Sequence, residues 1–445
     1  MSFLSRMPGP PADLVVAGAH VLDPRTGVDG PADVLVRDGV IAEIGAPGAT
    51  AAPEGVETVD GAGAHLFPAF VDPHVHLRVP GEEHKEDLET GTRAAAAGGF
   101  CAVVGMPNTA PPIDGASVLR SVHDLAVTHA RVPVGFLAAA TVGQRGETLT
   151  EMAELRDAGA LGFTDDGLPI ASANVLRRAL QYQKLCGGVI ALHEEDPTLS
   201  GDGVMHEGSV SALLGLAGIP SISESTMIAR DAAIAAYEEG RIHVQHISAV
   251  ESVQAVAGAK AAGVRMTGEV TPHHLILTDE DVRSLDTALK FNPPARAERD
   301  RAALLDALRD GTIDCIATDH APHAPHEKEV PFEEAPMGTT GLETAFAALN
   351  TFLVEPGVLP LELVVERMTG GGALFGLPTP RIAVGETANL ALVGLDRAWQ
   401  PVEAGYESRS QNCCFGDREL RGRVLVTVAA GTIAYRERTF ALSAA

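Results

Sequence analysis

The stretch HLFPAFVDPHVH, residues 65–76, is an apolar run that ends in two histidines separated by one residue. An apolar run of this length is typical of a strand buried on both faces of a parallel sheet, and polar residues directly after it mark the start of a loop that can carry function. The same pattern recurs along the chain. Seven further runs share it: FCAVVGMPN, VPVGFLAAAT, ALGFTDDG, GVIALHEE, RIHVQHIS, VRMTGEVTPHH and DCIATDH.

Helical segments separate these eight strand candidates. HKEDLETGTRAAAAGG closes on a glycine pair, as helix C-caps commonly do. TLTEMAELRDAG begins with Thr148 and Glu151 in the spacing of a capping box, which predicts a helix start there. Eight strands that alternate with helices predict an α/β fold of the (β/α)8 TIM-barrel type, with a doubly wound open sheet as the alternative.

The two ends of the chain have a different texture. Residues 13–66 read as short alternating strands with Gly, Pro and Asp between them, and the same texture returns in RVLVTVAAGTIAYRER near the C-terminus. The two ends are therefore expected to pair into one small β-sandwich domain. The predicted organisation is residues 1–66 and 380–445 as the two parts of the β domain, and residues 67–379 as the catalytic barrel.

Composition narrows the class of protein. The formal net charge of −26 disfavours binding to nucleic acid or to an anionic membrane, both of which need basic clusters. A small anionic substrate remains compatible, because bulk charge is screened beyond about 8 Å at physiological salt. No apolar run is long enough to span a bilayer, and the N-terminus lacks the pattern of a secretory signal. Five cysteines without ligand spacing predict buried thiols, a reducing compartment and a cytoplasmic location.

Polar side chains at the strand ends predict a metal site, because these ends meet on one face of a barrel. They are His74, His76, Asn108, Asp165, Asp166, His193, His246 and Asp319. Residues two apart on a strand point to the same side, with Cα atoms about 6.6 Å apart, so the imidazoles of His74 and His76 can both reach one ion. Imidazole and carboxylate without thiolate suit Zn²⁺, with Mn²⁺ or Co²⁺ as substitutes. Four histidines and two carboxylates make six candidate ligands, which are too many for one tetrahedral ion and suit a two-metal site.

The motifs HVHLR, MPNT, FTDDG, ALHEE, HIS, ATDHAPH and FEEAPMGTTGLETA occur in this order. Together they resemble the amidohydrolase superfamily and, within it, the class I bacterial dihydroorotases. The resemblance implies two Zn²⁺ ions per subunit, bridged by a carboxylate and a hydroxide. It assigns His74, His76 and Asp319 to one ion, His193 and His246 to the other, and Asp166 to the bridge.

The bridge distinguishes branches of this superfamily. Hydantoinases and allantoinases use a carbamylated lysine at the end of the fourth strand, whereas the nearest lysines here, Lys85 and Lys184, lie far from that position. An aspartate of FTDDG takes its place, and the sequence leaves open whether Asp165 or Asp166 points inward.

The resemblance also implies a reaction. It is the reversible cyclisation of N-carbamoyl-L-aspartate to L-dihydroorotate in de novo pyrimidine (UMP) biosynthesis, with a metal-activated hydroxide as nucleophile and Asp319 as catalytic proton shuttle. Arg78 and Asn108 are expected to bind the substrate carboxylate, since a guanidinium can grip a carboxylate with two hydrogen bonds. The other expected substrate contacts are Asn292, His323 and the backbone N–H groups around Met337 and Gly338.

Four other features carry smaller expectations. His273 and His274 are interpreted as structural, and residues 326–328 (HEK) as a solvated charge cluster. Val79 stands where relatives carry an acidic residue, and this is where the chain departs from the family pattern. An acidic residue there could orient Arg78, so its absence is expected to affect substrate affinity.

Three alternative functions remain. An allantoinase or hydantoinase is disfavoured because the bridging lysine is missing and because Arg78 indicates a substrate that carries a carboxylate. A metal-free, dihydroorotase-like partner of aspartate transcarbamoylase is disfavoured by the full set of ligand positions. A purely binding or structural protein leaves the convergence of polar strand ends unexplained. Association with a transcarbamoylase, and a homodimer, are left open by the sequence.

Overall fold

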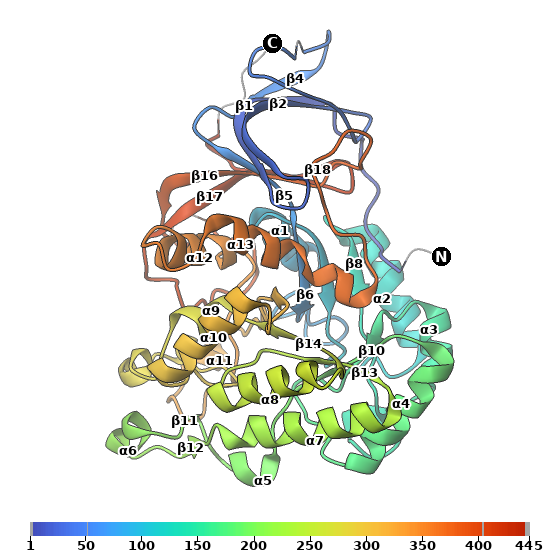
Figure 1. Ribbon diagram of the computed structural model, residues 1–445, viewed down its shortest axis with the longest axis vertical. Helices are drawn as coiled ribbons and strands as arrows, with labels where there is room; N and C mark the ends of the chain where they lie inside the picture. The colour runs from blue at the N-terminus through green and yellow to red at the C-terminus, as the bar shows by residue number, and fades with distance from the viewer. Residues whose placement is uncertain (1–2, 51, 403–404, 441–445) are drawn as a thin grey trace.

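The computed structural model describes residues 3–50, 52–402 and 405–440. A β-sheet domain lies at one end of the long axis, and a larger body of strands wrapped by helices lies at the other (Figure 1). Within the described ranges, no helix has the length and apolar character needed to cross a membrane.

The larger body is a closed parallel barrel. Its strands are β6 (Phe70–Val75), β7 (Phe100–Gly105), β8 (Val134–Phe136), β9 (Gly162–Phe163), β10 (Val189–Leu192), β13 (Arg241–Val244), β14 (Arg265–Val270) and β15 (Cys315–Ile316). Strands β6, β7 and β8 form one hydrogen-bonded group, and β9, β10, β13, β14 and β15 form the other. Parallel bridges at Ala138–Phe163 and Val75–His320 join the two groups into a ring. The predicted barrel is confirmed, and the open-sheet alternative is wrong.

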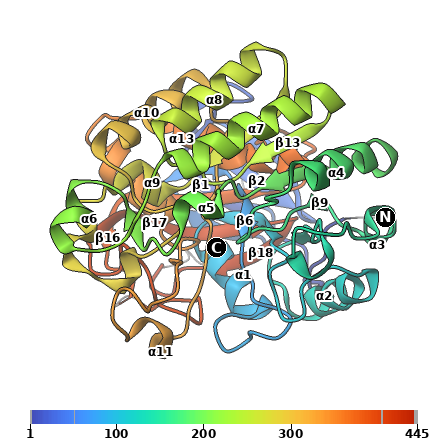
Figure 2. The ribbon, with the colours of Figure 1, turned by 90° about the horizontal axis from the view of Figure 1, so that it is seen from below.

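Helices surround the strands, as the view from below shows (Figure 2). The α-helices are α1 (Leu88–Ala97), α2 (Ala116–His129), α3 (Met152–Ala158), α4 (Ala173–Cys186), α5 (Pro197–Ser200), α6 (Ser209–Leu214), α7 (Ile222–Glu238), α8 (Val250–Ala261), α9 (Pro272–Ile276), α10 (Glu298–Asp310), α11 (Pro325–Lys328), α12 (Ala345–Leu349) and α13 (Leu361–Thr369). A parallel pair β11 (Met205–His206) and β12 (Gly218–Ile219) lies between α5 and α7. Helix α1 ends on Gly98 as expected, and Gly99 follows with φ +87°, a left-handed conformation that glycine adopts without strain.

The capping box expected at Thr148 is wrong. Helix α3 begins only at Met152, and Glu151 occupies its N-cap position without a side-chain hydrogen bond. Thr148 instead accepts a backbone hydrogen bond from Val142, and a β-bridge joins Leu149 to Thr141. These contacts pair the segment with the loop after β8, and tertiary pairing overrides the local helix signal.

The β domain is a single sheet to which both ends of the chain contribute. Its strands are β1 (Leu14–Asp23), β2 (Val28–Arg37), β3 (Val40–Gly45), β4 (Glu57–Asp60), β5 (His65–Pro68), β16 (Leu390–Trp399), β17 (Leu420–Ala429) and β18 (Thr432–Arg436). The order is β18-β17-β16-β5-β1-β2-β3, and β4 pairs with β1. The sheet curls over an apolar core of its own (Figure 1), so one sheet supplies both layers of the expected sandwich.

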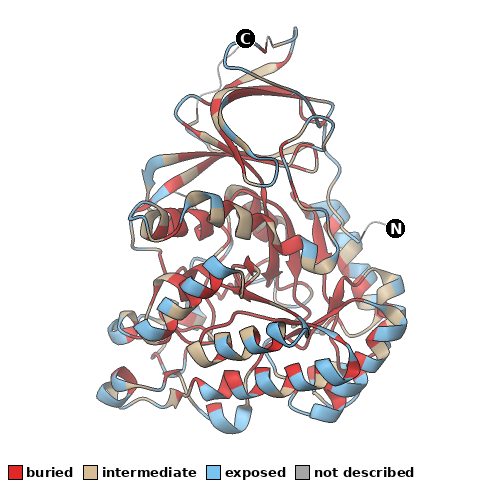
Figure 3. Cartoon of the chain, in the orientation of Figure 1, coloured by how far each residue is buried: buried red, intermediate tan, exposed pale blue. Residues whose placement is uncertain are grey.

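The stretch 65–76 connects the two domains directly. β5 pairs with β16 in the β domain, and one residue later β6 begins as the first barrel strand. The rings of Phe67 and Phe70 pack on Phe346, with centroids 5.5 and 5.4 Å away. Burial is continuous along these strands, whereas the outer faces of the helices are exposed (Figure 3). These three rings belong to the apolar cluster of the barrel, so the link between β5 and β6 is packed against the barrel core.

Candidate active site

Two groups of potential metal ligands lie at the carboxyl ends of the barrel strands. The first is His74, His76 and Asp319, and the second is Asp166, His193 and His246. All six side chains are buried, and within each group one ligand atom per residue lies within 4.8 Å of the others. Residues from five different strand ends thus converge on one place, as the sequence predicted.

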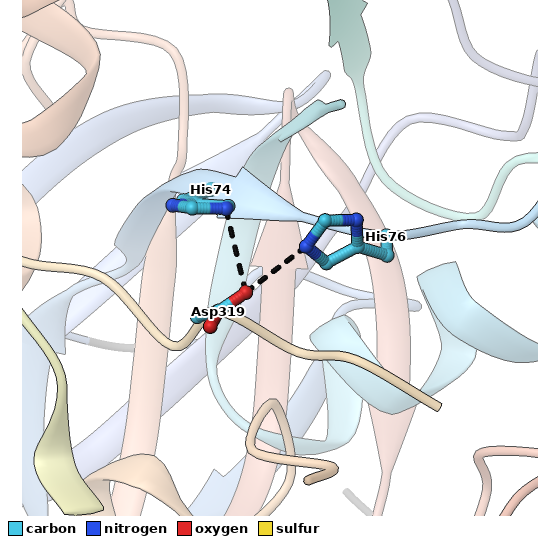
Figure 4. Close-up of side chains that lie close together, drawn as sticks. All are labelled: His74, His76 and Asp319. Carbon is cyan, nitrogen blue, oxygen red and sulfur yellow. Dashed lines mark hydrogen bonds and ion pairs between the residues drawn. The ribbon is translucent and has the colours of Figure 1, made fainter. Parts of the chain in front are cut away.

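In the first group, the carboxylate of Asp319 faces both imidazoles at the end of β6 (Figure 4). Asp319 Oδ1 lies 3.0 Å from His76 Nε2 and 3.4 Å from His74 Nε2. In the second group, His193 Nδ1 and His246 Nε2 are 2.9 Å apart. Each group therefore presents nitrogen and oxygen atoms to a common point.

Asp166 connects the two groups. Its Oδ1 lies 3.3 Å from His74 Nε2 and 3.9 Å from His246 Nε2, while its Oδ2 lies 3.5 Å from His76 Nε2. Asp165 points away and accepts hydrogen bonds from the backbone N–H and the hydroxyl of Thr141. The structure therefore resolves the choice left open by the sequence, because only Asp166 faces both groups of ligands.

The donor set fits a pair of divalent metal ions. His74 Nε2 and Asp166 Oδ1 are fully buried and lie 3.3 Å apart, yet among the described residues neither has a partner with hydrogen-bond geometry. A buried polar atom without a hydrogen bond is costly, and a metal ion would satisfy both atoms at once. Four imidazoles and two carboxylates without thiolate are a ligand set that suits zinc-type ions.

The charges around this centre favour ionised carboxylates. Burial alone would raise the pKa of Asp319, but the neighbouring His74 and His76 hold it well below its ordinary value. Burial would likewise raise the pKa of Asp166, but His74 and His76 lower it below its ordinary value. Both carboxylates are therefore charged at neutral pH, which is the form that binds a cation or accepts a proton.

Three site residues adopt a left-handed backbone that side chains other than glycine rarely adopt. The φ angles are +58° at Arg78, +33° at His246 and +48° at Asp319. Such a conformation costs about 1–3 kcal/mol per residue and persists only where the surrounding structure imposes it. Its occurrence at three converging positions marks the strand ends as a functional site.

Glu269 is a site residue that the sequence analysis missed. It lies within β14, where its Oε1 is 2.6 Å from His74 Nδ1 and its Oε2 is 3.0 Å from His243 Nε2. Burial would raise its pKa, but His74 and His243 lower it to about 2. A carboxylate in this position fixes the tautomer and orientation of the ligand histidine. The signal available in VRMTGEV was an acidic residue inside a run predicted to be a barrel strand.

We expect Glu269→Gln to weaken metal binding about 10- to 100-fold, the usual effect of losing a carboxylate behind a ligand histidine. The amide has the same shape but can accept from only one of the two histidines. Titration of chelator-treated protein, with bound metal measured by atomic emission, checks this. A variant with the metal affinity of the wild type would show that Glu269 does not orient His74.

A cavity of about 280 Å³ opens onto the metal ligands. It is lined by His76, Arg78, Asn108, Asp166, Gly167, His193, His246, Asn292, Asp319, Ala321, His323, Met337 and Gly338. Every site residue proposed from the sequence lines this cavity except His74, which lies behind it and is fully buried. The structure thus brings the metal ligands and the expected substrate contacts together.

Arg78 reaches the cavity although the acidic neighbour of the family pattern is missing. Its Nε donates to the carbonyl of Pro322 at 3.2 Å, and Nη1 lies 3.9 Å from Glu82 Oε2. Val79 is buried in the apolar core, and its side chain has no polar group that needs a hydrogen-bond partner in the loop. The orientation of the guanidinium is therefore held by the loop after β15 and by Glu82.

Two asparagines of the cavity are fixed by neighbours that determine which atom each presents. Asn108 Oδ1 accepts from His76 Nδ1 at 2.8 Å, which leaves its NH₂ group for the cavity. Asn292 Nδ2 donates to Glu195 Oε2 at 2.5 Å, and Glu195 Oε2 also lies 3.2 Å from His193 Nε2. Glu195, another residue that the sequence analysis did not single out, thus orients both a metal ligand and a cavity asparagine.

The loop at Met337 and Gly338 differs in detail from expectation. The Gly338 N–H was expected to face the substrate, but it donates to the carbonyl of Lys290 at 2.8 Å. The Met337 carbonyl accepts from His323 Nε2 at 2.9 Å. Gly338 has φ +143°, and a Cβ there would lie 2.9 Å from Ala321 and His323 atoms, so glycine permits the close approach of the loop. The loop lines the cavity, but the Gly338 N–H is not available to a ligand.

The solvated charge cluster expected at residues 326–328 is wrong for Lys328. Lys328 is buried, and its Nζ donates to the carbonyls of Thr287, Lys290 and Pro336 at 2.9, 3.3 and 2.7 Å. Burial lowers its pKa to about 7. The sequence alone cannot show whether a lysine in a short charged run is solvated or is buried and donates to backbone carbonyls.

His273 and His274 both lie in the interior, next to Phe291. His274 bonds the Thr271 hydroxyl and donates to the Pro293 carbonyl, each at 2.8 Å. The ring of His273 packs 4.4 Å from that of Phe291. Neither residue lines the cavity.

Comparison with known proteins agrees with the geometry. The model of the Dihydro-orotase-like family matches residues 63–252, and that of the Amidohydrolase family matches residues 224–433. The dihydroorotase of Geobacter sp. (strain M21) is 44% identical over 425 residues, covering 95% of this chain and 99% of the relative. The dihydroorotase of Pelotomaculum thermopropionicum is also 44% identical, over 96% of this chain and 99% of the relative.

Solved structures show the same fold. The L-hydantoinase (dihydropyrimidinase) from Arthrobacter aurescens superposes with a TM-score of 0.84 at 25% identity, over 97% of both chains. The dihydropyrimidinase from Brevibacillus agri NCHU1002 gives a TM-score of 0.81 at 23% identity, over 97% of this chain and 96% of the other.

A parallel barrel with two joined groups of histidine and carboxylate ligands defines a metal-dependent hydrolase of the amidohydrolase type. Within that class, the relatives that are 44% identical over nearly the full length place the molecule more narrowly. The chain belongs to the dihydroorotase family.

Proposed function

We propose that this protein is a dihydroorotase, which interconverts N-carbamoyl-L-aspartate and L-dihydroorotate in de novo pyrimidine biosynthesis. One observation carries the proposal: in a single cavity, a carboxylate joins two groups of metal ligands, and the guanidinium of Arg78 faces the same space. The first feature suits amide hydrolysis, and the second suits a cyclic amide that carries a carboxylate. The dihydroorotase relatives support the same substrate.

The metal in this proposal is zinc, with two ions per chain. His74, His76 and Asp319 would hold one ion, His193 and His246 the other, and Asp166 would contact both. A pair of such ions supplies Lewis acidity for a ring carbonyl and lowers the pKa of a nearby water. The buried atoms of His74 and Asp166 that make no hydrogen bond support this assignment.

Asp319 is placed to move the proton. In the direction of hydrolysis, a water oxygen forms a bond to the ring carbonyl carbon and the carbon–nitrogen bond breaks, so one proton must pass from the water to the leaving nitrogen. The charged carboxylate of Asp319 lines the cavity and accepts that proton, then donates it to the nitrogen. In the direction of ring closure, the same group takes the proton from the attacking nitrogen.

The other polar side chains of the cavity bind the part of the substrate that does not react. Arg78 offers a guanidinium that is anchored through Nε, so its terminal nitrogens can grip the substrate carboxylate. The NH₂ group of Asn108 donates to the same carboxylate, since its oxygen is engaged by His76. Asn292 is held by Glu195 through its nitrogen and presents its oxygen to a ring N–H.

We expect Arg78→Met to raise the KM for L-dihydroorotate by about 30-fold or more, in line with about 2 kcal/mol for a charge-assisted hydrogen bond. Arg78→Lys should recover only part of the loss, because an ammonium lacks the planar fork. Steady-state kinetics check the result. An unchanged KM in Arg78→Met would mean that the carboxylate binds elsewhere.

The direct test of the proposed function is an assay of the purified protein with L-dihydroorotate, hydantoin and allantoin side by side. We expect hydrolysis of L-dihydroorotate, and ring closure of N-carbamoyl-L-aspartate, at rates far above those for the two substrates without a carboxylate. Preferential turnover of hydantoin or allantoin would contradict the proposal.

A cytoplasmic location belongs to the same proposal. The five cysteines are free thiols, which supports a reducing compartment. A homodimer and an association with aspartate transcarbamoylase are the two partners that the sequence leaves open, and neither is part of this proposal.

A further inference from the structure

A segment of the β domain reaches down to the catalytic cavity. Between β16 and β17, residues 405–416 leave the sheet and contact the loops that follow β15. Those loops carry Ala321, His323 and Gly338, all of which line the cavity. One wall of the site is thus supported by a part of the chain that supplies no metal ligand and does not itself line the cavity.

Asn412 makes this contact with its whole side chain. Oδ1 accepts from the His323 backbone N–H at 3.0 Å, and Nδ2 donates to the carbonyls of Ala321 and Gly338, each at 3.1 Å. Two carbonyl partners require the NH₂ group on that side, so the hydrogen bonds themselves fix the orientation of the amide. Asn412 is buried, and its three bonds join two loops that are separate in sequence.

The main chain of Asn412 strengthens the same connection. Its carbonyl accepts from the Thr340 N–H at 3.1 Å and from the Thr339 hydroxyl at 3.0 Å. Both threonines directly follow Gly338. The loop after β15 and the loop at Gly338 are therefore tied to one residue of the β domain by five hydrogen bonds.

We propose that Asn412 is a positioning residue that sets substrate affinity by holding the His323 loop and the Gly338 loop at a fixed separation. It contacts no metal ligand side chain, so its effect should fall on the substrate wall and spare the metal centre. The inference rests on the proposed function and deepens it, because it assigns the β domain a part in binding the substrate.

Asn350 provides a matched control. It is also buried, and its Nδ2 likewise donates to two backbone carbonyls, those of Leu395 and Arg421, at 3.3 and 3.2 Å. These carbonyls lie in β16 and β17, away from the cavity. Asn350→Ala therefore removes a buried amide that donates to two carbonyls, as Asn412→Ala does, without touching the substrate wall.

The experiment compares wild type, Asn412→Ala, Asn412→Asp and Asn350→Ala in the metal-loaded full-length protein. Asn412→Asp keeps the shape and the acceptor for His323 but loses both donors, which provides a second variant if the alanine protein folds poorly. For each protein we would measure KM and kcat for L-dihydroorotate, bound metal, and backbone hydrogen exchange in residues 319–324 and 336–341.

Both Asn412 variants should raise KM at least 10-fold, with kcat within about 3-fold of wild type and unchanged metal content. Both should also speed exchange in the two loops, whereas Asn350→Ala should leave KM and loop exchange unchanged. Unchanged loop exchange in the Asn412 variants, or the same KM in Asn412→Ala and Asn350→Ala, would overturn the assignment. Wild-type protein without dihydroorotase activity would refute the proposed function instead, and the exchange data would still test whether Asn412 holds the two loops.

Discussion

Asp319→Asn should reduce kcat for L-dihydroorotate by about 10³-fold or more while most of the bound metal remains. The size of the effect follows from the loss of general acid–base catalysis, which contributes about 10²–10⁴-fold. The amide keeps an oxygen at the position of Oδ1, 3.0 Å from His76 and 3.4 Å from His74, and so retains a neutral ligand atom. It cannot take up the proton that the leaving nitrogen needs.

The measurement pairs steady-state kinetics with metal analysis on the same sample. Asp306→Asn is a suitable control, because that carboxylate is exposed on α10 and, within the described part of the chain, forms an ion pair only with Arg309. An Asp319→Asn enzyme with more than about a tenth of wild-type kcat would remove Asp319 from the proton-transfer role, since a shuttle contributes at least about 10²-fold.

Asp166→Ala should abolish turnover and lower the bound metal to at most one ion per chain. Asp166 is the carboxylate that faces both groups of candidate ligands, so its removal would take one ligand from each group at once. The second group would retain only His193 and His246, too few protein ligands for the three that catalytic zinc sites usually have.

Asp165→Asn is the matched control for this prediction. Asp165 is the adjacent buried carboxylate, but it accepts its hydrogen bonds from Thr141 and faces away from the ligands. The variant should be less stable by about 1–3 kcal/mol, because one buried hydrogen bond is lost. Its metal content should stay at the wild-type level. If the two variants lost metal equally, the assignment of Asp166 as the shared ligand would be wrong.

The barrel could be predicted from the sequence because most of its strands are buried on both faces and read as apolar runs. The convergence of the candidate ligands could be predicted because a barrel brings the polar ends of those runs to one face, as seen for His74, His193 and His246. This reasoning needs only chain order and the fold class. It does not need to know which side chains touch.

The residues that the sequence did not reveal act through contacts between distant segments. Glu269 meets His74 across 195 positions of the chain, and Asn412 meets His323 across 89. The local sequence around either residue does not indicate which distant residue it contacts. The same limit explains Lys328, whose three acceptors belong to loops that approach it only in the folded chain.

Local signals also failed where tertiary pairing competes with them. Thr148 has the spacing of a cap, yet its segment pairs with the loop after β8. Asp165 and Asp166 are equivalent in sequence, and only the geometry of the loop after β9 turns one of them inward. The domain boundaries placed at residues 66/67 and 379/380 stay predictions, beside a sheet in which β5 and β16 are hydrogen-bonded neighbours.

The most direct test of the central claim is a metal titration of chelator-treated protein in which bound zinc and L-dihydroorotate turnover are measured together. We expect no turnover in the metal-free protein, and turnover that rises with bound zinc and reaches its maximum at two ions per chain. Full turnover without metal, or no turnover of L-dihydroorotate at any zinc content, would contradict the assignment of this site as a metal-dependent dihydroorotase centre.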